Sequence, residues 1–213
     1  MEALVARLDL VEAPVALAGR ELSVLRPRSS EALLDEAAFE REEFLPYWAE
    51  LWPSGLALAR ALESIDVVRA RVLELGCGLA LPSFAAALGG ADVLATDWSP
   101  DAIELVRANA ERNGVALRAA RIPWDQPAPL LAGAPWELVL AADVLYERRN
   151  ADALLDLLPR LVDERGTVLL ADPGRPAAAG FFAAAEERWS VEREAETALP
   201  ASRMTVSRLR LSG

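Results

Sequence analysis

Acidic, aromatic and glycine residues gather at the ends of the apolar segments in this chain. The stretch VLELGCGLALPS, residues 72–83, places Gly76 and Gly78 directly after an apolar run and Glu74 inside that run. Later apolar runs end in Asp97-Trp98, Trp124-Asp125, Ala142-Asp143 and Asp172. Glycine permits close approach of a ligand to the backbone. Ligands of open parallel sheets bind beyond the carboxyl ends of the strands, so we expect one acidic, indole-lined site there.

The spacing of these residues selects a class of ligand. Asp97 follows Gly76 by about 20 residues, the separation at which an acidic side chain receives ribose hydroxyls. Leu81 stands where a dinucleotide fingerprint has its third glycine, and the chain has no Lys for a P-loop. An adenosine ligand without a pyrophosphate remains. S-adenosylmethionine fits, because its ammonium and sulfonium are cationic and Glu74 would attract them.

Composition excludes several other chemistries. The chain has no His, which removes Ser-His-Asp hydrolases, His general bases and His-metal sites. Cys77 is the single cysteine, so neither a Cys-rich zinc site nor an internal disulfide is possible, and we expect no metal. The net charge is −11 and no dense basic run occurs, which argues against nucleic acid as a partner. A basic protein or a small cationic substrate suits this charge.

The chain shows neither a membrane-spanning run nor the features of a signal peptide. No uninterrupted apolar stretch reaches spanning length. The first residues, MEALVARLDL, lack a basic start and a long apolar segment. We therefore expect a cytoplasmic protein that does not bind membranes and is a monomer.

From residue 71 onward, expected strands alternate with expected helices, and these elements would position the site. Strands are expected at 71–75, 91–97, 115–122, 136–143, 166–172, 189–196 and 203–211, and helices at 82–88, 99–114, 151–162 and 177–188. Short apolar runs without alternation indicate strands buried on both faces. The pattern predicts an α/β fold, a Rossmann-like, seven-stranded, mostly parallel sheet with helices on both faces. The last two strands lack a helix between them, so one strand near the C-terminus should be antiparallel.

Residues 1–70 differ from this pattern. PVALAGRELSVLRP, residues 14–27, predicts a hairpin with Gly19 in its turn, and residues 56–62 predict a helix. Trp48 is expected to attach this segment to the core. No linker or repeat divides the chain, so we predict a single domain over 1–213. It would comprise a hairpin and helix addition at 1–70 and a seven-stranded core at 71–213.

Four of these segments resemble successive motifs of class I S-adenosylmethionine-dependent methyltransferases. They are VLELGCGLALPS, ATDWSPDAIELVRANAERNG, PWD and LVLAADVLYE. The preceding PYWAELWPSGLALARAL resembles the seven-β-strand group of protein-lysine methyltransferases, which includes the electron-transfer-flavoprotein β-subunit enzyme and bacterial relatives. The resemblance covers roughly residues 40–175. Ala80 stands where the superfamily has a third glycine. The Pro-Pro-Tyr motif of enzymes that methylate exocyclic base nitrogens is absent.

The resemblance implies roles for individual residues. For the cofactor, it implies ribose binding by Asp97, adenine contacts from Trp98, Trp124 and Asp125, and a pocket lining from Trp52 and the Ala142 backbone. Asp143 and Tyr146 would face an incoming amine. Several of these residues also have a structural interpretation: a tight glycine turn, an ordinary strand residue for Glu74, a cap of the next helix for Asp97, a packed indole, or a buried tyrosine with a satisfied hydroxyl.

The sequence therefore predicts an S-adenosylmethionine-dependent N-methyltransferase that acts on a lysine ε-amino group of a partner protein. Without His, Asp143 is the nearest candidate to hold the ammonium and accept its proton, and Tyr146 would orient the nitrogen. Two alternatives stay open on the same fold, a small-molecule N-methyltransferase and a non-catalytic S-adenosylmethionine-binding module. A nicotinamide-cofactor oxidoreductase is a more distant one.

Overall fold

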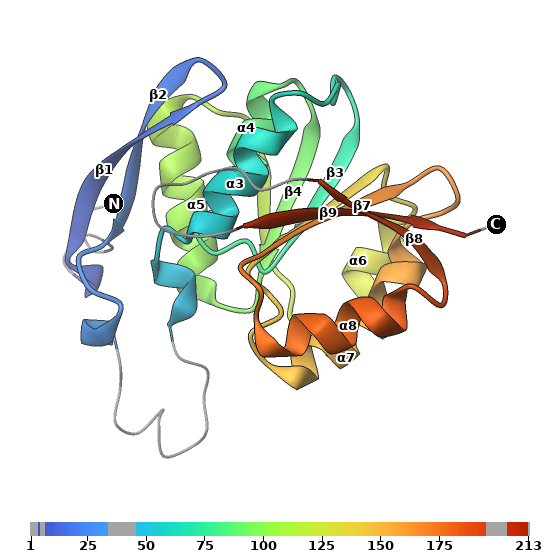
Figure 1. The fold of residues 1–213 in the computed structure, drawn as a ribbon. Coiled ribbons are helices and arrows are strands. Elements are labelled where there is room, and N and C mark those ends of the chain that lie inside the picture. The colour runs from blue at the N-terminus through green and yellow to red at the C-terminus, as the bar shows by residue number, and fades with distance from the viewer. Residues whose placement is uncertain (1–3, 5–6, 34–45, 195–203, 213) are drawn as a thin grey trace.

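A seven-stranded sheet forms the centre of the computed structural model, which describes residues 4, 7–33, 46–194 and 204–212 (Figure 1). Its strand order is β5-β4-β3-β6-β7-β9-β8. The strands are β3 (Arg71–Leu75), β4 (Asp92–Asp97), β5 (Arg118–Arg121), β6 (Leu138–Ala142), β7 (Thr167–Asp172), β8 (Trp189–Glu194) and β9 (Thr205–Leu211). β3 to β7 pair in parallel, and β9 runs antiparallel to both of its neighbours. The predicted sheet with one reversed strand near the C-terminus is confirmed.

Both faces of the sheet are covered, which explains why its strands read as continuous apolar runs. In β6, Leu138 and Leu140 join one buried cluster, whereas Val139 and Ala141 join the other. The first cluster packs against helices α3 (Pro53–Leu62), α4 (Leu81–Leu88) and α5 (Pro100–Asn113). The second packs against α6 (Ala128–Ala132), α7 (Arg148–Leu161) and α8 (Pro176–Ala185), so the helices form two layers around the sheet (Figure 1).

Helix α5 shows how local signals set an element's bounds. The Ser99 hydroxyl accepts a hydrogen bond from the Ala102 amide, and Gly114 ends the helix with φ +61°. The amide of Val115 donates back to Ala110 at 2.9 Å. Because this cap uses the residue after Gly114, the expected strand at 115–122 is too long, and β5 begins only at Arg118.

Four helices also differ from expectation, and one of them, α8, ends at Ala185 instead of residue 188. α3 begins at Pro53 instead of residue 56, since proline is favoured in the first helical turn. α7 begins at Arg148 instead of residue 151, and its first turn is polar. The short helix α6 was not expected at all, because APLLA lies between prolines and is too short to show periodicity.

The N-terminal hairpin consists of β1 (Leu10–Leu17) and β2 (Arg20–Pro27). Ala18 and Gly19 form its turn with φ of +50° and +71°, as a two-residue hairpin turn requires. The hairpin is confirmed. The division of a single domain into an addition at 1–70 and a core at 71–213 stays a prediction.

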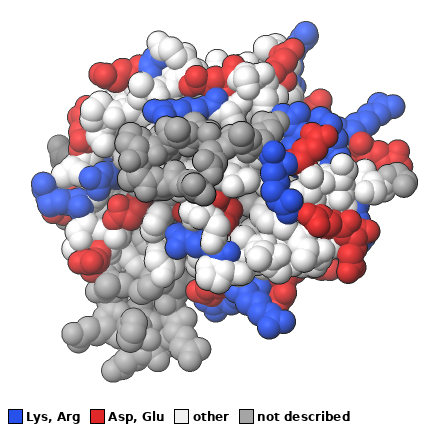
Figure 2. Space-filling model, in the orientation of Figure 1, with Lys and Arg blue, Asp and Glu red and all other residues white. Residues whose placement is uncertain are grey.

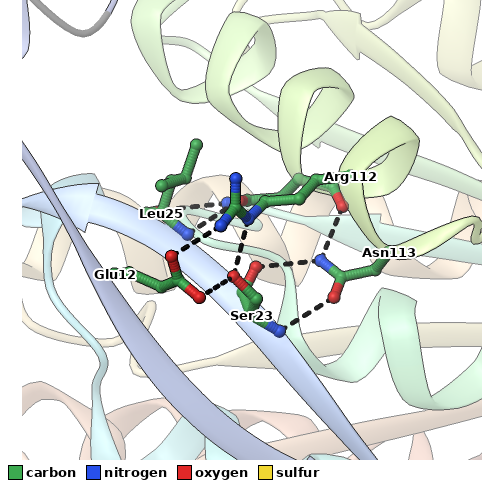
Figure 3. Close-up of polar contacts among 6 residues, drawn as sticks. Glu12, Ser23, Leu25, Arg112 and Asn113 are labelled. Atoms are coloured by element: carbon green, nitrogen blue, oxygen red, sulfur yellow. Dashed lines mark hydrogen bonds and ion pairs between the residues drawn. The ribbon is translucent and has the colours of Figure 1, made fainter.

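Helix α5 holds the hairpin through two asparagines one turn apart. The buried Asn109 side chain accepts from the Leu25 amide at 2.8 Å and donates to the Leu25 carbonyl at 2.9 Å. The Asn113 side chain makes the same pair of bonds with Ser23, at 2.8 and 3.0 Å (Figure 3). Arg112 adds a bond to the Ser23 hydroxyl at 2.6 Å. These amides pair the free edge of β2 with a helix.

The surface mixes charges of both signs. On the face shown in Figure 2, arginines and acidic residues are interspersed and do not separate by sign. Oppositely charged side chains form exposed ion pairs, such as Arg118 with Asp92 at 2.9 Å and Arg193 with Glu186 at 2.8 Å. Within the described ranges, no helix is both long enough and apolar enough to cross a membrane.

Candidate active site

A cavity of about 470 Å³ opens where β3, β4, β5 and β6 end. It is lined by every residue that the sequence analysis predicted to bind the cofactor or to face the acceptor amine. These are Trp52, Glu74, Gly76, Gly78, Asp97, Trp98, Trp124, Asp125, Ala142, Asp143 and Tyr146. Asp172, expected on the same rim, does not line the cavity. Its Oδ1 accepts instead from the amides of Gly174 and Arg175 at 2.7 and 2.8 Å.

The turn between β3 and α4 forms the floor of the cavity. Gly76, Gly78 and Ala80 have φ of +63°, +50° and +58°. A Cβ on Gly78 would lie 3.2 Å from the carbonyl oxygen of Trp48, and one on Gly76 would lie 3.1 Å from Val144 Cγ1. The protein's own packing therefore already requires both glycines, in addition to any ligand. Ala80 adopts a left-handed conformation that costs about 1 kcal/mol for a residue with a side chain.

We expect Gly78→Ala to lower both the free energy of unfolding and cofactor affinity. The substitution combines left-handed strain with crowding against Trp48, together about 2 kcal/mol. Gly114→Ala is the matched control, because Gly114 has φ +61° and a Cβ added there would meet no atom within 4 Å, so only strain remains. Urea unfolding and calorimetry with S-adenosylhomocysteine check this. Equal losses of stability, with cofactor affinity unchanged in both variants, would show that the Trp48 contact is irrelevant.

Asp97 ties the glycine turn to the start of α5. Its Oδ2 accepts from the Gly78 amide at 3.0 Å and its Oδ1 accepts from the Ser99 amide at 2.9 Å. The residue is only 3% exposed, and burial raises the pKa of its carboxyl group. The backbone amide of Trp98 also interacts with this carboxylate. A carboxylate can accept about four hydrogen bonds, so Asp97 keeps acceptor capacity for a ligand hydroxyl.

Glu74 lies within β3 and is almost completely buried. Its Oε2 accepts from the Ser83 amide, in the first turn of α4, at 2.9 Å. Burial raises the pKa of the carboxyl group to about 8, and the nearby Asp97 carboxylate contributes to this rise. In the cofactor-free protein, Glu74 is therefore largely protonated at neutral pH. A cationic ligand group would favour the ionised form.

Two indoles and a carboxylate line the part of the cavity beyond β4 and β5. Trp98 follows Asp97, and its carbonyl accepts from Arg121 Nε at 2.7 Å. Trp124 lies beside the glycine turn, with its Cζ2 3.4 Å from the Cβ position of Gly76. Asp125 is exposed at the rim. The arrangement offers flat apolar faces beside an acceptor, which suits a purine ring with an exocyclic amine.

Asp143 follows β6 and is fixed by three hydrogen bonds, one from its backbone amide and two to its carboxylate. Its backbone has φ +55°, and its amide donates to the Ala171 carbonyl of β7 at 2.9 Å. The carboxylate Oδ1 accepts from Arg175 Nε at 2.8 Å, and Oδ2 accepts from the Ser54 hydroxyl at 3.1 Å. The side chain of Asp143 is 6% exposed and that of Arg175 is 35% exposed. The sequence did not anticipate either partner.

Three aromatic rings surround this end of the cavity. The rings of Tyr47 and Tyr146 meet edge to face with centroids 5.1 Å apart, and Tyr47 lies 6.1 Å from Trp52. The Trp52 indole donates to the Tyr47 carbonyl at 2.6 Å. Burial raises the pKa of Tyr146, so its phenol stays protonated and able to donate. Sequence reasoning missed Tyr47, although it stands in the PYWAELWPSG segment. Trp48 packs in a buried cluster with Leu105, as expected.

The single reversed strand β9, which lies between β7 and β8, and a cavity beyond the parallel strand ends are features of the class I S-adenosylmethionine-dependent methyltransferase fold. The solved Thermus thermophilus 16S rRNA N2 G1207 methyltransferase, in complex with AdoMet and guanosine, matches with a TM-score of 0.68. It is 16% identical and the match covers 95% of this chain and 51% of that chain. At this identity the likeness concerns the fold.

The chain belongs to the lysine methyltransferase family, whose model matches residues 46–188. The electron transfer flavoprotein beta subunit lysine methyltransferase of Xenopus laevis is 44% identical over 137 residues, 61% of this chain and 53% of that protein. The Homo sapiens protein of the same name is 36% identical over 146 residues, 63% of this chain and 52% of that protein. The chain thus spans about half the length of the curated relatives it matches. These matches confirm the resemblance of the motifs.

The methyl donor of this class is S-adenosylmethionine, and the residues of the cavity fit it. Asp97 keeps acceptor capacity beside the glycine turn, and Glu74 is a buried carboxyl whose ionisation a cation would favour. The ligand carries hydroxyls, an ammonium and a purine, and the cavity presents an acceptor, an acid and indoles. Its volume lies in the range of small-molecule sites, about 300–1,000 Å³.

Proposed function

We propose that this chain transfers a methyl group from S-adenosylmethionine to a lysine ε-amino group of a partner protein. One observation carries the proposal. A single cavity has one end built on Asp97 and the glycine turn, which suits a nucleoside, and another end with Asp143, Tyr146 and two further aromatic rings. The second end provides an acceptor and a donor for an amine. Membership in the lysine methyltransferase family favours lysine as the source of that amine.

In this proposal the cofactor residues act as a rigid receptor. Asp97 binds the ribose hydroxyls, and Glu74 stabilises the ammonium of the methionine part. The adenine lies among Trp98, Trp124 and Asp125, and the remaining lining comes from the backbone of Gly76, Gly78 and Ala142 and from the Trp52 ring. The bound cofactor supplies a methyl group on a positively charged sulfur, which is a good leaving group. Much of the catalysis can therefore come from alignment of the two reactants.

At the other end, the acceptor nitrogen attacks the methyl carbon with its lone pair. The N–C bond forms as the C–S bond breaks, the electron pair of that bond goes to sulfur, and the positive charge passes to nitrogen. Asp143 accepts a hydrogen bond from the amine and Tyr146 orients it. The acceptor must lose its third proton before it attacks, because an ammonium has no lone pair. A proton leaves the methylated nitrogen to water afterwards.

The names of the relatives indicate which partner to test first. Two of them are methyltransferases of the electron transfer flavoprotein β-subunit. We propose that protein as the first candidate substrate. The net charge of −11 would favour encounter with a basic surface on it. The small-molecule alternative requires that a free amine reach the same carboxylate.

The test incubates the chain with methyl-labelled S-adenosylmethionine and either a recombinant electron transfer flavoprotein β-subunit or a cognate cell extract. Label is then measured in separated protein, nucleic-acid and small-molecule fractions, and labelled protein is hydrolysed to identify the methylated amino acid. Methyllysine is expected. The chain itself contains no Lys, so it cannot contribute methyllysine as background. Label confined to small molecules or nucleic acid, or found only as methylarginine, would refute the proposal.

A further inference from the structure

The ion pair between Asp143 and Arg175 places a cation directly behind the acceptor carboxylate. Arg175 Nε donates to Oδ1 of Asp143 at 2.8 Å, and the guanidinium carbon lies 5.7 Å from the centroid of the Trp52 ring. Asp143 lines the cavity, whereas Arg175 does not. Arg175 therefore approaches the carboxylate from outside and leaves the cavity side open to an acceptor.

The loop that carries Arg175 is fixed by its own hydrogen bonds. Asp172, at the end of β7, accepts from the backbone amides of Gly174 and Arg175. The hydrogen bond to Asp143 raises the pKa of Arg175, so the guanidinium stays charged at every working pH. This cation is a constant feature of the acceptor end.

Other charged or titratable groups also face this pair. From β7, the partly buried Asp172 contributes a second carboxyl group, whose pKa is raised by burial. Tyr47 approaches Arg175 from the N-terminal segment, and Tyr146 lines the cavity beyond Asp143. Arg149 also lines the cavity and forms an ion pair with Glu147. Among the described groups, the direct partners of the Asp143 carboxylate are Arg175 and Ser54.

A lone carboxylate at this position would work against the reaction. It would attract the lysine as an ammonium and stabilise its third proton, because an opposite charge favours the charged form. The ammonium would bind well and react poorly. A guanidinium bonded to the same carboxylate offsets this attraction, yet it leaves the carboxylate oxygens able to accept an N–H bond.

We propose that Arg175 is a positioning residue that, by pairing with Asp143, makes the acceptor end select the neutral amine over the ammonium. The inference rests on the proposed function. The ε-ammonium loses its proton to water on entry, and its nitrogen then has the lone pair that forms the N–C bond as the C–S bond breaks. Arg175 touches neither reactant in this scheme and acts through the charge of Asp143.

Two kinetic signatures follow for Arg175→Gln. The freed Asp143 should hold the ammonium more tightly, so KM for a protein acceptor falls. The bound acceptor should keep its proton to higher pH, so kcat at neutral pH falls by about tenfold and recovers in alkaline buffer. A purely structural role for Arg175 would instead lower kcat at all pH values and would leave KM unchanged or raised.

A binding experiment tests the same idea without any methyl transfer. Sinefungin carries an amine where the methyl group of the donor stands. The ratio of its affinity to that of S-adenosylhomocysteine therefore measures how strongly the acceptor end binds an ammonium. Calorimetry at neutral pH should show this ratio rising by about tenfold in Arg175→Gln, and staying near the wild-type value in Arg175→Lys. Because neither ligand is a methyl donor, this result is separate from the success or failure of the lysine assay.

Arg193→Gln is the matched control, because Arg193 also pairs with a carboxylate, Glu186, and lies over an aromatic ring, Phe182, away from the cavity. Its ratio should not change. An unchanged or lower ratio in Arg175→Gln, with S-adenosylhomocysteine affinity retained, overturns the proposal. If Arg175→Gln fails to fold, Arg175→Met, which keeps an unbranched side chain without a charge, replaces it, and the same two outcomes of the ratio decide.

Discussion

Replacement of Asp143 by asparagine is expected to lower kcat/KM for methyl transfer by about ten- to a thousandfold, the range for loss of an orienting and charge-matching group. Asparagine keeps the shape of the side chain and its hydrogen bond with Ser54, but it removes the negative charge that faces the acceptor. Arg175 loses its partner at little cost, because it is partly exposed and can be solvated. Affinity for S-adenosylhomocysteine should stay nearly the same, since Asp97 and Glu74, which we propose bind the cofactor, are unchanged.

The measurement pairs calorimetric cofactor affinity with methyl transfer to the protein acceptor. Glu186→Gln is the control, because it makes the same carboxylate-to-amide change in an arginine pair outside the cavity. Tyr146→Phe should reduce kcat/KM less than Asp143→Asn does, since it removes one hydrogen bond and no charge. For the Asp143→Asn variant, full methyl-transfer activity would show that the Asp143 carboxylate has no part in the reaction.

The free energy of unfolding of the cofactor-free protein is expected to fall as pH rises from about 5 to 8, and Glu74→Gln should remove much of that fall. The pKa of Glu74 is about 8 in the folded chain and ordinarily 4.5. Between these values the native state holds a proton that the unfolded chain has lost, so rising pH favours unfolding. The stabilisation is complete below about pH 4.5 and is lost as pH rises through 8, by up to about 5 kcal/mol.

Urea unfolding of wild type and Glu74→Gln at several pH values isolates the contribution of Glu74. Burial also raises the pKa of Asp97 and Asp172, but these two groups are present in both proteins. Glutamine keeps an oxygen for the Ser83 amide and never ionises. The two pH curves should converge at low pH and separate towards pH 8, where the variant is the more stable. Parallel curves would show that Glu74 is already ionised in the folded protein.

If Glu74 binds the cofactor ammonium as proposed, the same carboxyl group should link cofactor binding to proton release. An ammonium brought to Glu74 favours its ionised form, so affinity for S-adenosylhomocysteine should rise with pH until about 8. Calorimetry in buffers of different ionisation enthalpy should detect the released proton in wild type and not in Glu74→Gln.

The grouping of the proposed cofactor residues in one cavity could be predicted from sequence, because these residues follow one another along the chain. The glycines, the Asp97 spacing and the helix that starts at Ser99 are local signals, and parallel strand ends meet at one edge. Asp172 was misplaced by the same rule, because its carboxylate bonds its own loop. The rule locates strand ends but does not say which way a side chain points.

The acceptor end required the structure. The pairing of Asp143 with Arg175 joins residues 32 positions apart from the loops after two neighbouring strands. Nothing in DPGRP separates that arginine from the many others in the chain. Ser54 and Tyr47 come from the N-terminal segment, whose placement over the cavity depends on how α3 packs. Such contacts depend on tertiary packing and leave no periodic trace in the sequence.

The asparagine pair of α5 also determines where the chain can accept extra residues. Four residues of helix rise by about 6 Å, close to the roughly 6.8 Å spanned by two residues of strand, so Asn109 and Asn113 match Leu25 and Ser23. An insertion within Ser23–Leu25 would shift one of these residues out of reach and turn its side chain to the opposite face. An insertion in the Ala18–Gly19 turn would leave both amide pairs in place. Loop grafts and affinity tags are therefore better placed at the tip of the hairpin than along β2.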